Sequence, residues 1–511
     1  MRTIVGTRFG LGLLACLPLV EAPAEARAKD QAAVAEKGAV AEKAATRSAA
    51  PAAVPGGARQ TLPLSLADAV FVGLRKNTTI RSAYIDRVAQ LFNLKVSEDI
   101  FTPKFRLDAS AVRSAQGNKI TDTAALSPSA QLLTPIGTTF GFVWDNAVSR
   151  TGQQRSYGST LSATFAQPLL KGAGLEVNLA PIQSARLAER VNQLNLKALV
   201  STTITDIITG YRALLTSQES LKLAEESVVR AQAILEVNET LIQAGRMART
   251  EIVQTQADLE NQKLNVLQAQ NQVDQSRLAL AAILDLDLST NIVIRDKLNV
   301  ARVAVVFEDA LQIALKCRPD YAIQFAAQEQ ARLGLLIADN QRLPDLSLVG
   351  TGAVSRAAQT ATGLPSVKSR AVDGSIGMRL SAPLNDLSLE QGYVGATASL
   401  KNAEIQLAVT RRNVEQQIRQ SVVSVDLTWR QVEAARRVEA LAASAVDIEK
   451  QKLAVGRSST FQVQSLESSY RFSKAQVLNA ELSYVNALTA LDLQLGTTLD
   501  TWKIALRTTD Y

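Results

Sequence analysis

The sequence predicts an α+β fold in which long antiparallel coiled-coil helices adjoin β-strands that have one apolar face. Three observations predict it: two long segments with heptad-spaced apolar residues, two regions in which apolar and polar residues alternate, and a duplication of this plan along the chain. Helical patterns far longer than the usual 8–20 residues are typical of coiled coils. Strict alternation is typical of strands with one apolar face.

The duplication is visible as matching motifs in the same order. The stretch Leu66–Ala69 matches Phe307–Ala310, and the stretch Phe165–Leu169 matches Leu380–Leu384. Two copies of one plan, residues 63–290 and 306–498, then account for most of the chain. Each copy holds a helix, strands and a long helical hairpin, and residues 499–511 are a C-terminal tail.

The N-terminus has the pattern of an export signal. Two arginines precede an uncharged stretch and an A-x-A site that ends at Ala26, so we expect a signal peptide over residues 1–26. Acylation of Cys16 in a lipobox-like sequence is the minor alternative. Residues 27–60 are rich in Ala and Pro with almost no large apolar side chains, which predicts a flexible leader.

Heptad spacing predicts the helices and glycines predict their turns. One series recurs every seven residues and has a counterpart in the second copy: Ile252, Leu259, Val266, Val273 and Leu280, matched by Val463, Tyr470, Val477, Tyr484 and Leu491. Gly245 and Gly456 each interrupt the heptads once. Because glycine is favoured just past a helix end, each is predicted to be the turn of a helical hairpin.

The alternating regions predict strands. A soluble, half-buried sheet gives the same alternation as a membrane barrel, and the strands by themselves favour it. Leu161, Ala163 and Phe165 share one face, as do Ile376 and Leu380 in the second copy. Two hairpins cannot close a barrel, and an open sheet edge is prohibitive in lipid. If the strands are membrane strands, several chains must therefore contribute to one barrel. The longer first β region, residues 115–156, predicts a longer hairpin or an external loop.

Composition excludes several classes of function. The chain has no histidine, two cysteines and a net charge of +7 over 511 residues. It therefore lacks the usual general base and the ligands of metal clusters. No basic stripe with interleaved aromatic residues supports nucleic-acid binding. We expect no enzyme activity, no catalytic residues, no metal and no cofactor.

One passage resembles a known family. The stretch Thr164–Gly174, followed by Val177–Ala180, is similar to the strand end and helix start of the TolC-like outer membrane efflux proteins, the outer membrane factors. The Leu66–Ala69 opening and the placement of Gly456 are similar too. The resemblance implies a homotrimer in which each protomer gives four strands to a twelve-stranded transmembrane barrel. The long helices would form an α-barrel.

The resemblance also implies a location and partners. The barrel would contact lipid in the outer membrane of a Gram-negative-type bacterium, with the helical tunnel in the periplasm. A periplasmic adaptor and an inner membrane pump would dock on it in a tripartite efflux or type I secretion system. The channel would conduct substrates passively to the exterior, with porin activity.

The family closes its tunnel just past the second hairpin turn. The positions that match its acidic ring are Gln462 and Ser465, so cation selectivity is not predicted. The nearest carboxylates are Glu251 and Glu467, and these four residues are the candidates for the periplasmic gate or constriction.

Two other classes remain open from the residues alone. A periplasmic coiled-coil adaptor also has long hairpins, and a structural envelope protein needs only the coiled coils. The duplicated strand and helix plan argues against the first, and the alternating strands argue against the second.

Overall fold

The computed structural model describes residues 61–245, 248–296, 298, 300–360, 367–384 and 386–506. These residues belong to one compact unit, Thr61–Tyr511. The signal-peptide and leader predictions for residues 1–60, Cys16 included, lie outside the described residues.

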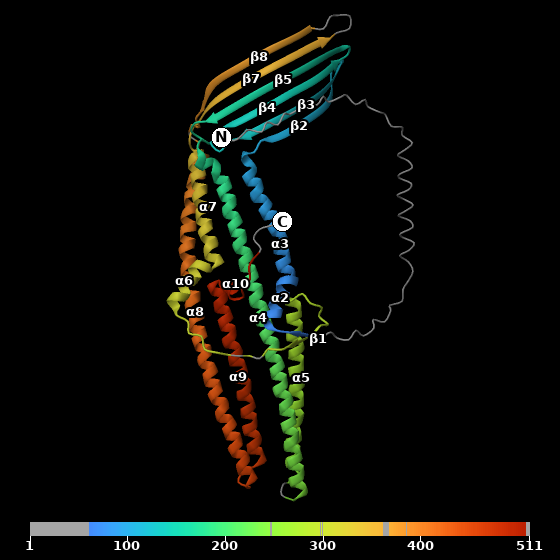
Figure 1. Ribbon diagram of the computed structural model, residues 1–511, viewed down its shortest axis with the longest axis vertical. Coiled ribbons are helices and arrows are strands. Elements are labelled where there is room, and N and C mark those ends of the chain that lie inside the picture. Colours follow the sequence, from blue (N-terminus) through green and yellow to red (C-terminus); the bar gives the residue numbers. More distant parts are fainter. Residues whose placement is uncertain are drawn as a thin grey trace, which may run out of the picture. The chain divides into compact units, whose positions relative to one another are not determined.

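Two helices of 69 and 68 residues dominate the fold, α4 (Leu175–Gln243) and α8 (Leu387–Ala454). Each is followed by a helix that packs back along it, α5 (Glu251–Ile283) after α4 and α9 (Thr460–Leu495) after α8 (Figure 1). At about 1.5 Å per residue, each long helix reaches roughly 100 Å. In the part of the chain that the structure describes, no helix has both the length and the apolar composition needed to cross a membrane.

Shorter helices precede each long hairpin, and local signals set their ends. They are α2 (Leu66–Lys76), α3 (Thr78–Glu98), the 3-10 turn η1 (Asp99–Phe101), α6 (Phe307–Cys317) and α7 (Pro319–Gln341), with α10 (Thr498–Thr501) after α9. Ser65 and Asp68 form a capping box at the start of α2. Pro319 occupies the first turn of α7, where its missing N–H costs nothing.

Helix α4 is the centre of the helical layer. It contacts α3 and α5 from its own half of the chain and α7 and α9 from the other half. Helix α8 contacts α6, α7 and α9. The two helical hairpins are thus held side by side chiefly through α4.

A single antiparallel sheet holds six strands in the order β2-β3-β4-β5-β7-β8. The strands are β2 (Lys104–Gln116), β3 (Lys119–Leu133), β4 (Thr139–Thr151), β5 (Gln154–Pro168), β7 (Asp345–Thr360) and β8 (Val367–Ser381). A separate two-stranded parallel sheet pairs β1 (Thr61–Leu64) with β6 (Asn291–Ile294).

The expectation of four strands per chain was wrong. The long first β region forms an additional hairpin, β3 and β4, inserted between β2 and β5 in the same sheet. Two-residue turns at its outer end open with Gly117 and Gly152, whose φ angles are +59° and +60°. A glycine with positive φ in first position is typical of a tight hairpin turn, so this region continues the sheet instead of looping out of it.

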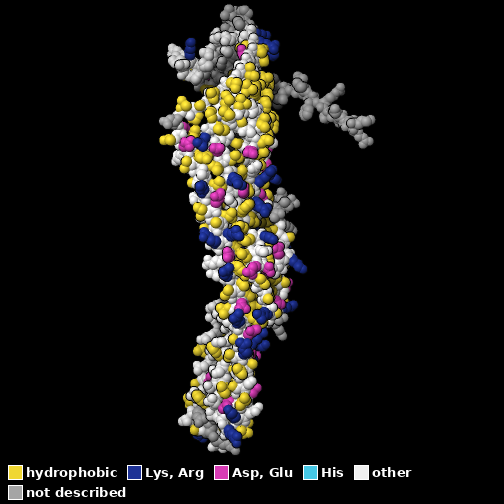
Figure 2. Space-filling view, turned by 90° about the vertical axis from the view of Figure 1, so that its left-hand side faces the viewer, with side chains coloured by type: hydrophobic (Ala, Val, Ile, Leu, Met, Phe, Trp, Pro, Cys, Tyr) yellow, Lys and Arg dark blue, Asp and Glu magenta, His cyan; other side chains and the backbone are white. Residues whose placement is uncertain are grey.

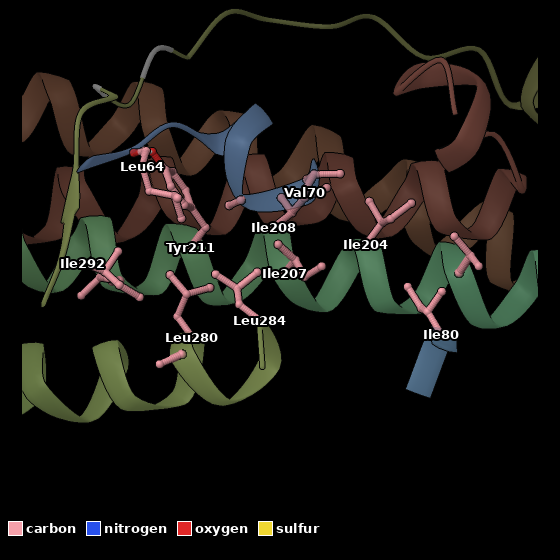
Figure 3. Packing of buried hydrophobic residues seen from close by; sticks show 14 of the residues in the cluster. Leu64, Val70, Ile80, Ile204, Ile207, Ile208, Tyr211, Leu280, Leu284 and Ile292 are labelled. Atoms are coloured by element: carbon pink, nitrogen blue, oxygen red, sulfur yellow. The ribbon is translucent and has the colours of Figure 1, made fainter. Parts of the chain in front are cut away.

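The main apolar core lies where α2, α4 and α5 meet the small sheet (Figure 3). Ile204, Ile207 and Tyr211 of α4 are buried there against Val70 and Leu280. The Tyr211 hydroxyl donates to the Leu64 carbonyl at 3.1 Å and to the Asp296 carboxylate at 2.8 Å. Burial, and then the hydrogen bond to Asp296 and its negative charge, raise the pKa of Tyr211 well above its usual value of 10.

Candidate functional site

The six-stranded sheet has one continuous apolar face. The register pairs apolar positions across every strand boundary, for example Phe105 with Ala130, Phe140 with Phe165 and Val354 with Val372. The large side chains of this face are exposed: Phe105, Leu107, Leu126, Phe142, Trp144, Leu161, Val372, Ile376, Met378 and Leu380. Figure 2 shows hydrophobic side chains gathered over the sheet in its upper part. A patch this large marks a surface made to meet another apolar phase or protein.

The opposite face is polar. It carries Ser, Thr, Gly and charged residues, including Thr351, whose hydroxyl lies 2.7 Å from that of Ser375 on the next strand. Thr121 and Thr151 make the same kind of contact at 2.9 Å. The two faces together have the apolar and polar alternation of a strand wall between lipid and water.

The strands are long enough for such a wall. Each has at least 13 residues, and a tilted membrane strand needs about 9–11. The sheet is open in one chain, with β2 and β8 as its edges. Because neighbouring strands are antiparallel and their number is even, these two edges run in opposite directions. The β8 edge of one copy can therefore pair antiparallel with the β2 edge of another.

A glycine-rich turn joins the sheet to the long helix. Gly172 and Gly174 follow β5 with φ angles of +79° and +95°. Asn178 donates to the carbonyls of both glycines at 2.8 Å, and the Gly172 N–H donates to the Asn340 side chain at 2.7 Å. The turn thus fixes the direction in which α4 leaves the sheet.

The predicted turn residues lie at the far ends of the hairpins. Gly245 follows α4 and Gly456 follows α8, with φ angles of +69° and +73°. At the second turn Ser458 donates to the Glu449 carboxylate, and Lys452 lies 2.9 Å from it. These two contacts lower the pKa of Glu449.

Glu467 connects the two hairpins. Its carboxylate is nearly buried and lies 2.6 Å from the Lys450 ammonium of α8 and 3.7 Å from the Arg230 guanidinium of α4. Lys450 belongs to the same hairpin as Glu467, whereas Arg230 belongs to the other. The Glu467 carboxylate thus takes part in two ion pairs, one within its own hairpin and one with the other hairpin.

The other gate candidates are placed differently. Gln462 and Ser465 lie on α9 with exposed side chains, so they do not join the Glu467 cluster. The Gln462 backbone N–H donates to the Ser459 side chain at 3.2 Å, which caps the helix. Glu251 begins α5, and its side chain lies outside the described residues.

Two arginines that cross between hairpins were not singled out from the sequence. Arg230 is one, and the other is Arg212 of α4, which donates to the Val485 carbonyl at 2.8 Å and to Thr489 at 2.6 Å on α9. Burial lowers the pKa of Arg212. They lie 18 residues apart on α4, about five helical turns, but nothing in that spacing names the partner helix.

The fold is shared with solved outer membrane channels. VceC from Vibrio cholerae is 17% identical with a TM-score of 0.63, covering 84% of this chain and 96% of that one. The CmeC channel of Campylobacter jejuni is 17% identical with a TM-score of 0.62, covering 84% and 85%. The MtrE channel of Neisseria gonorrhoeae, solved in its open state, is 16% identical with a TM-score of 0.57, covering 84% and 88%.

Sequence comparison relates part of the chain to a known family. No curated protein matches the chain, but residues 74–285 match the family described as outer membrane efflux protein. That match covers the first strands, the glycine-rich turn and the first long hairpin. Residues 74–285 are thus similar to the outer membrane efflux protein family, and both halves of the chain share the fold of solved outer membrane channels.

Proposed function

We propose that three copies of this chain form a passive channel-tunnel across the outer membrane. The proposal rests chiefly on the six-stranded sheet. Its apolar face is exposed, its polar face lies opposite, and its two free edge strands run antiparallel to each other. The long hairpins, attached at one end of the sheet, would line a periplasmic tunnel. Sequence reasoning and the family match support the same placement.

The strand number changes the size of the proposed barrel. Three copies of a six-stranded sheet would give eighteen strands, not twelve. Barrel diameter grows roughly in proportion to strand number, so the lumen would be about one and a half times as wide as that of a twelve-stranded barrel. The helical tunnel, with the same two hairpins per chain, would be unaffected.

The partners are part of the proposal. A periplasmic adaptor and an inner membrane pump would dock at the hairpin ends, and the pump would supply the energy of a tripartite efflux or type I secretion system. The absence of any covalent step in this scheme agrees with a chain that has no histidine.

The oligomer is tested by the mass of the detergent-solubilised protein, corrected for bound detergent. We expect three chains per particle, and conductance across planar bilayers from the same preparation. A monomer that stays in solution without detergent would overturn the proposal. It would favour a periplasmic adaptor or a structural envelope protein instead.

We propose the hairpin ends as the gate, with Glu467 holding the hairpins together and Gln462, Ser465 and Glu251 near the constriction. At an effective dielectric constant of about 20, charges 3.7 Å apart attract by about 4 kcal/mol before desolvation is subtracted. Because the Arg230 side chain is 34% exposed, a net of about 1 kcal/mol is the reasonable expectation.

The test is Glu467→Gln, which keeps the size of the side chain and removes its charge. We expect open probability to rise about fivefold per broken contact, the factor that about 1 kcal/mol gives. The matched control is Glu481→Gln. Glu481 pairs with Arg436 on α8 within the same hairpin, so its loss should leave opening unchanged. Equal effects of both variants would contradict a gate at Glu467.

A further inference from the structure

The apolar face of the sheet ends in a group of cations near the outer turns, the turns furthest from the helices. Arg356 on β7 and Arg370 on β8 are directly paired in the register, and Lys368 lies two residues from Arg370 on the same face. All three side chains are exposed. We refer to these three residues as the basic cluster.

The basic cluster has no ion-pair partner among the described residues. By contrast, Arg113 on β2 is paired with Asp122 on β3 at 2.6 Å. Like charges directly opposite on neighbouring strands are destabilising. The Arg356 and Arg370 pair therefore favours an anion lying between them.

We propose that the basic cluster binds the headgroup of a membrane lipid that carries phosphate groups. The guanidinium groups of Arg356 and Arg370 would hold the phosphates in bidentate fashion, and the acyl chains would lie over the apolar rows towards the helices. The inference rests on the proposed function, because only a sheet placed in a membrane brings its apolar face to lipid.

Position on the apolar face favours a lipid over a free phosphate ion. Just beyond the cluster towards the helices, the same face carries Val354 and Val372, which are paired in the register. An arginine facing lipid costs about 2–4 kcal/mol at the bilayer midplane but little near the interface. The cluster therefore suits the headgroup level, with the apolar rows below it in hydrocarbon.

The test is lipid retention by the solubilised full-length protein, measured by native mass spectrometry after incubation with lipid A or with phosphatidylcholine. Lipid A carries phosphate without a balancing cation, and phosphatidylcholine is zwitterionic. The test variant is Arg356→Gln/Lys368→Gln/Arg370→Gln. The matched control, Lys104→Gln/Arg106→Gln/Arg379→Gln, removes three cations from the polar face.

We expect the wild type and the control to retain more lipid A than phosphatidylcholine. The ratio of retained lipid A to retained phosphatidylcholine should be at least about tenfold lower for the test variant. Equal retention by the test variant and the control would overturn the inference. So would complete displacement of lipid A by millimolar inorganic phosphate, because a free anion would then suffice. A trimer that conducts but does not prefer lipid A would refute this inference alone, whereas a monomer soluble without detergent would refute the proposed function itself.

Discussion

The hairpin formed by β3 and β4 offers a direct test of the eighteen-stranded barrel. Deleting residues 119–153 joins Gln116, Gly117 and Asn118 to Gln154. Strand β2 would then lead through a two-residue turn directly into β5. Both flanking glutamines lie on the polar face, so the apolar faces of β2 and β5 stay aligned, with Phe105 opposite Phe165.

The expected change can be worked out from strand geometry. With strands about 4.8 Å apart and tilted by about 40°, eighteen strands enclose a backbone diameter of about 36 Å and twelve enclose about 24 Å. The deletion variant should therefore have a barrel about two-thirds as wide as that of the wild type. Its helical tunnel should keep its width, because no helical residue is removed.

Electron microscopy of the detergent-solubilised particles, viewed down the barrel axis, measures both diameters. A wild-type barrel about 24 Å wide would refute the reasoning, because β3 and β4 would then lie outside the barrel wall. Equal diameters for wild type and variant would refute it in the same way. If the variant does not fold, the wild-type diameter decides alone.

Three further predictions concern the stability of the helical part, measured as thermal unfolding midpoints in detergent. Gly496→Ala should lower the free energy of unfolding by about 1–3 kcal/mol, because Gly496 has a φ of +74° and an added Cβ would lie 2.7 Å from the Cys317 carbonyl oxygen. The control Gly392→Ala, with open space around it in α8, should stabilise slightly; equal effects would contradict the strain argument. Tyr211→Phe removes a buried hydroxyl that bonds the buried Leu64 carbonyl and the Asp296 carboxylate, and it should lower the free energy of unfolding by about 1–2 kcal/mol; an unchanged midpoint would contradict it. Burial raises the pKa of Asp320, but the hydrogen bonds and charge of Arg318 outweigh burial and leave it below 3.8. The stabilisation that ionised Asp320 gives the folded protein is therefore complete above pH 3.8 and is lost as the pH falls below that value. The difference in unfolding midpoint between wild type and Asp320→Asn should shrink there, and a difference independent of pH would refute the assignment.

Much of the fold follows from local patterns. The heptad series predicts the long helices because a packed helix must repeat its apolar face. Gly245 and Gly456 follow the helices they were expected to end, and both have positive φ. Alternation of apolar and polar residues likewise predicts strands such as β5 and β8, since a strand turns successive side chains to opposite faces.

The strand count did not follow from the sequence. Residues 115–156 show alternation at Phe140, Phe142 and Trp144, but alternation within a segment does not say which strands pair or in what order. What makes β3 and β4 strands is pairing with neighbours on both sides, which lies outside any local window. The four-strand expectation came from the family resemblance, and this insertion departs from that pattern.

The sequence by itself determined the α+β class, the long hairpins with their turns, and the apolar face of the strands. These depend on periodicity within single segments, and periodicity is a local property. Only the tertiary structure decided the six-stranded register, the link from Glu467 to Arg230, and the pairing of Arg356 with Arg370. Each of these joins residues from separate elements, and the energy of such a contact depends on which surfaces meet, which no single segment specifies.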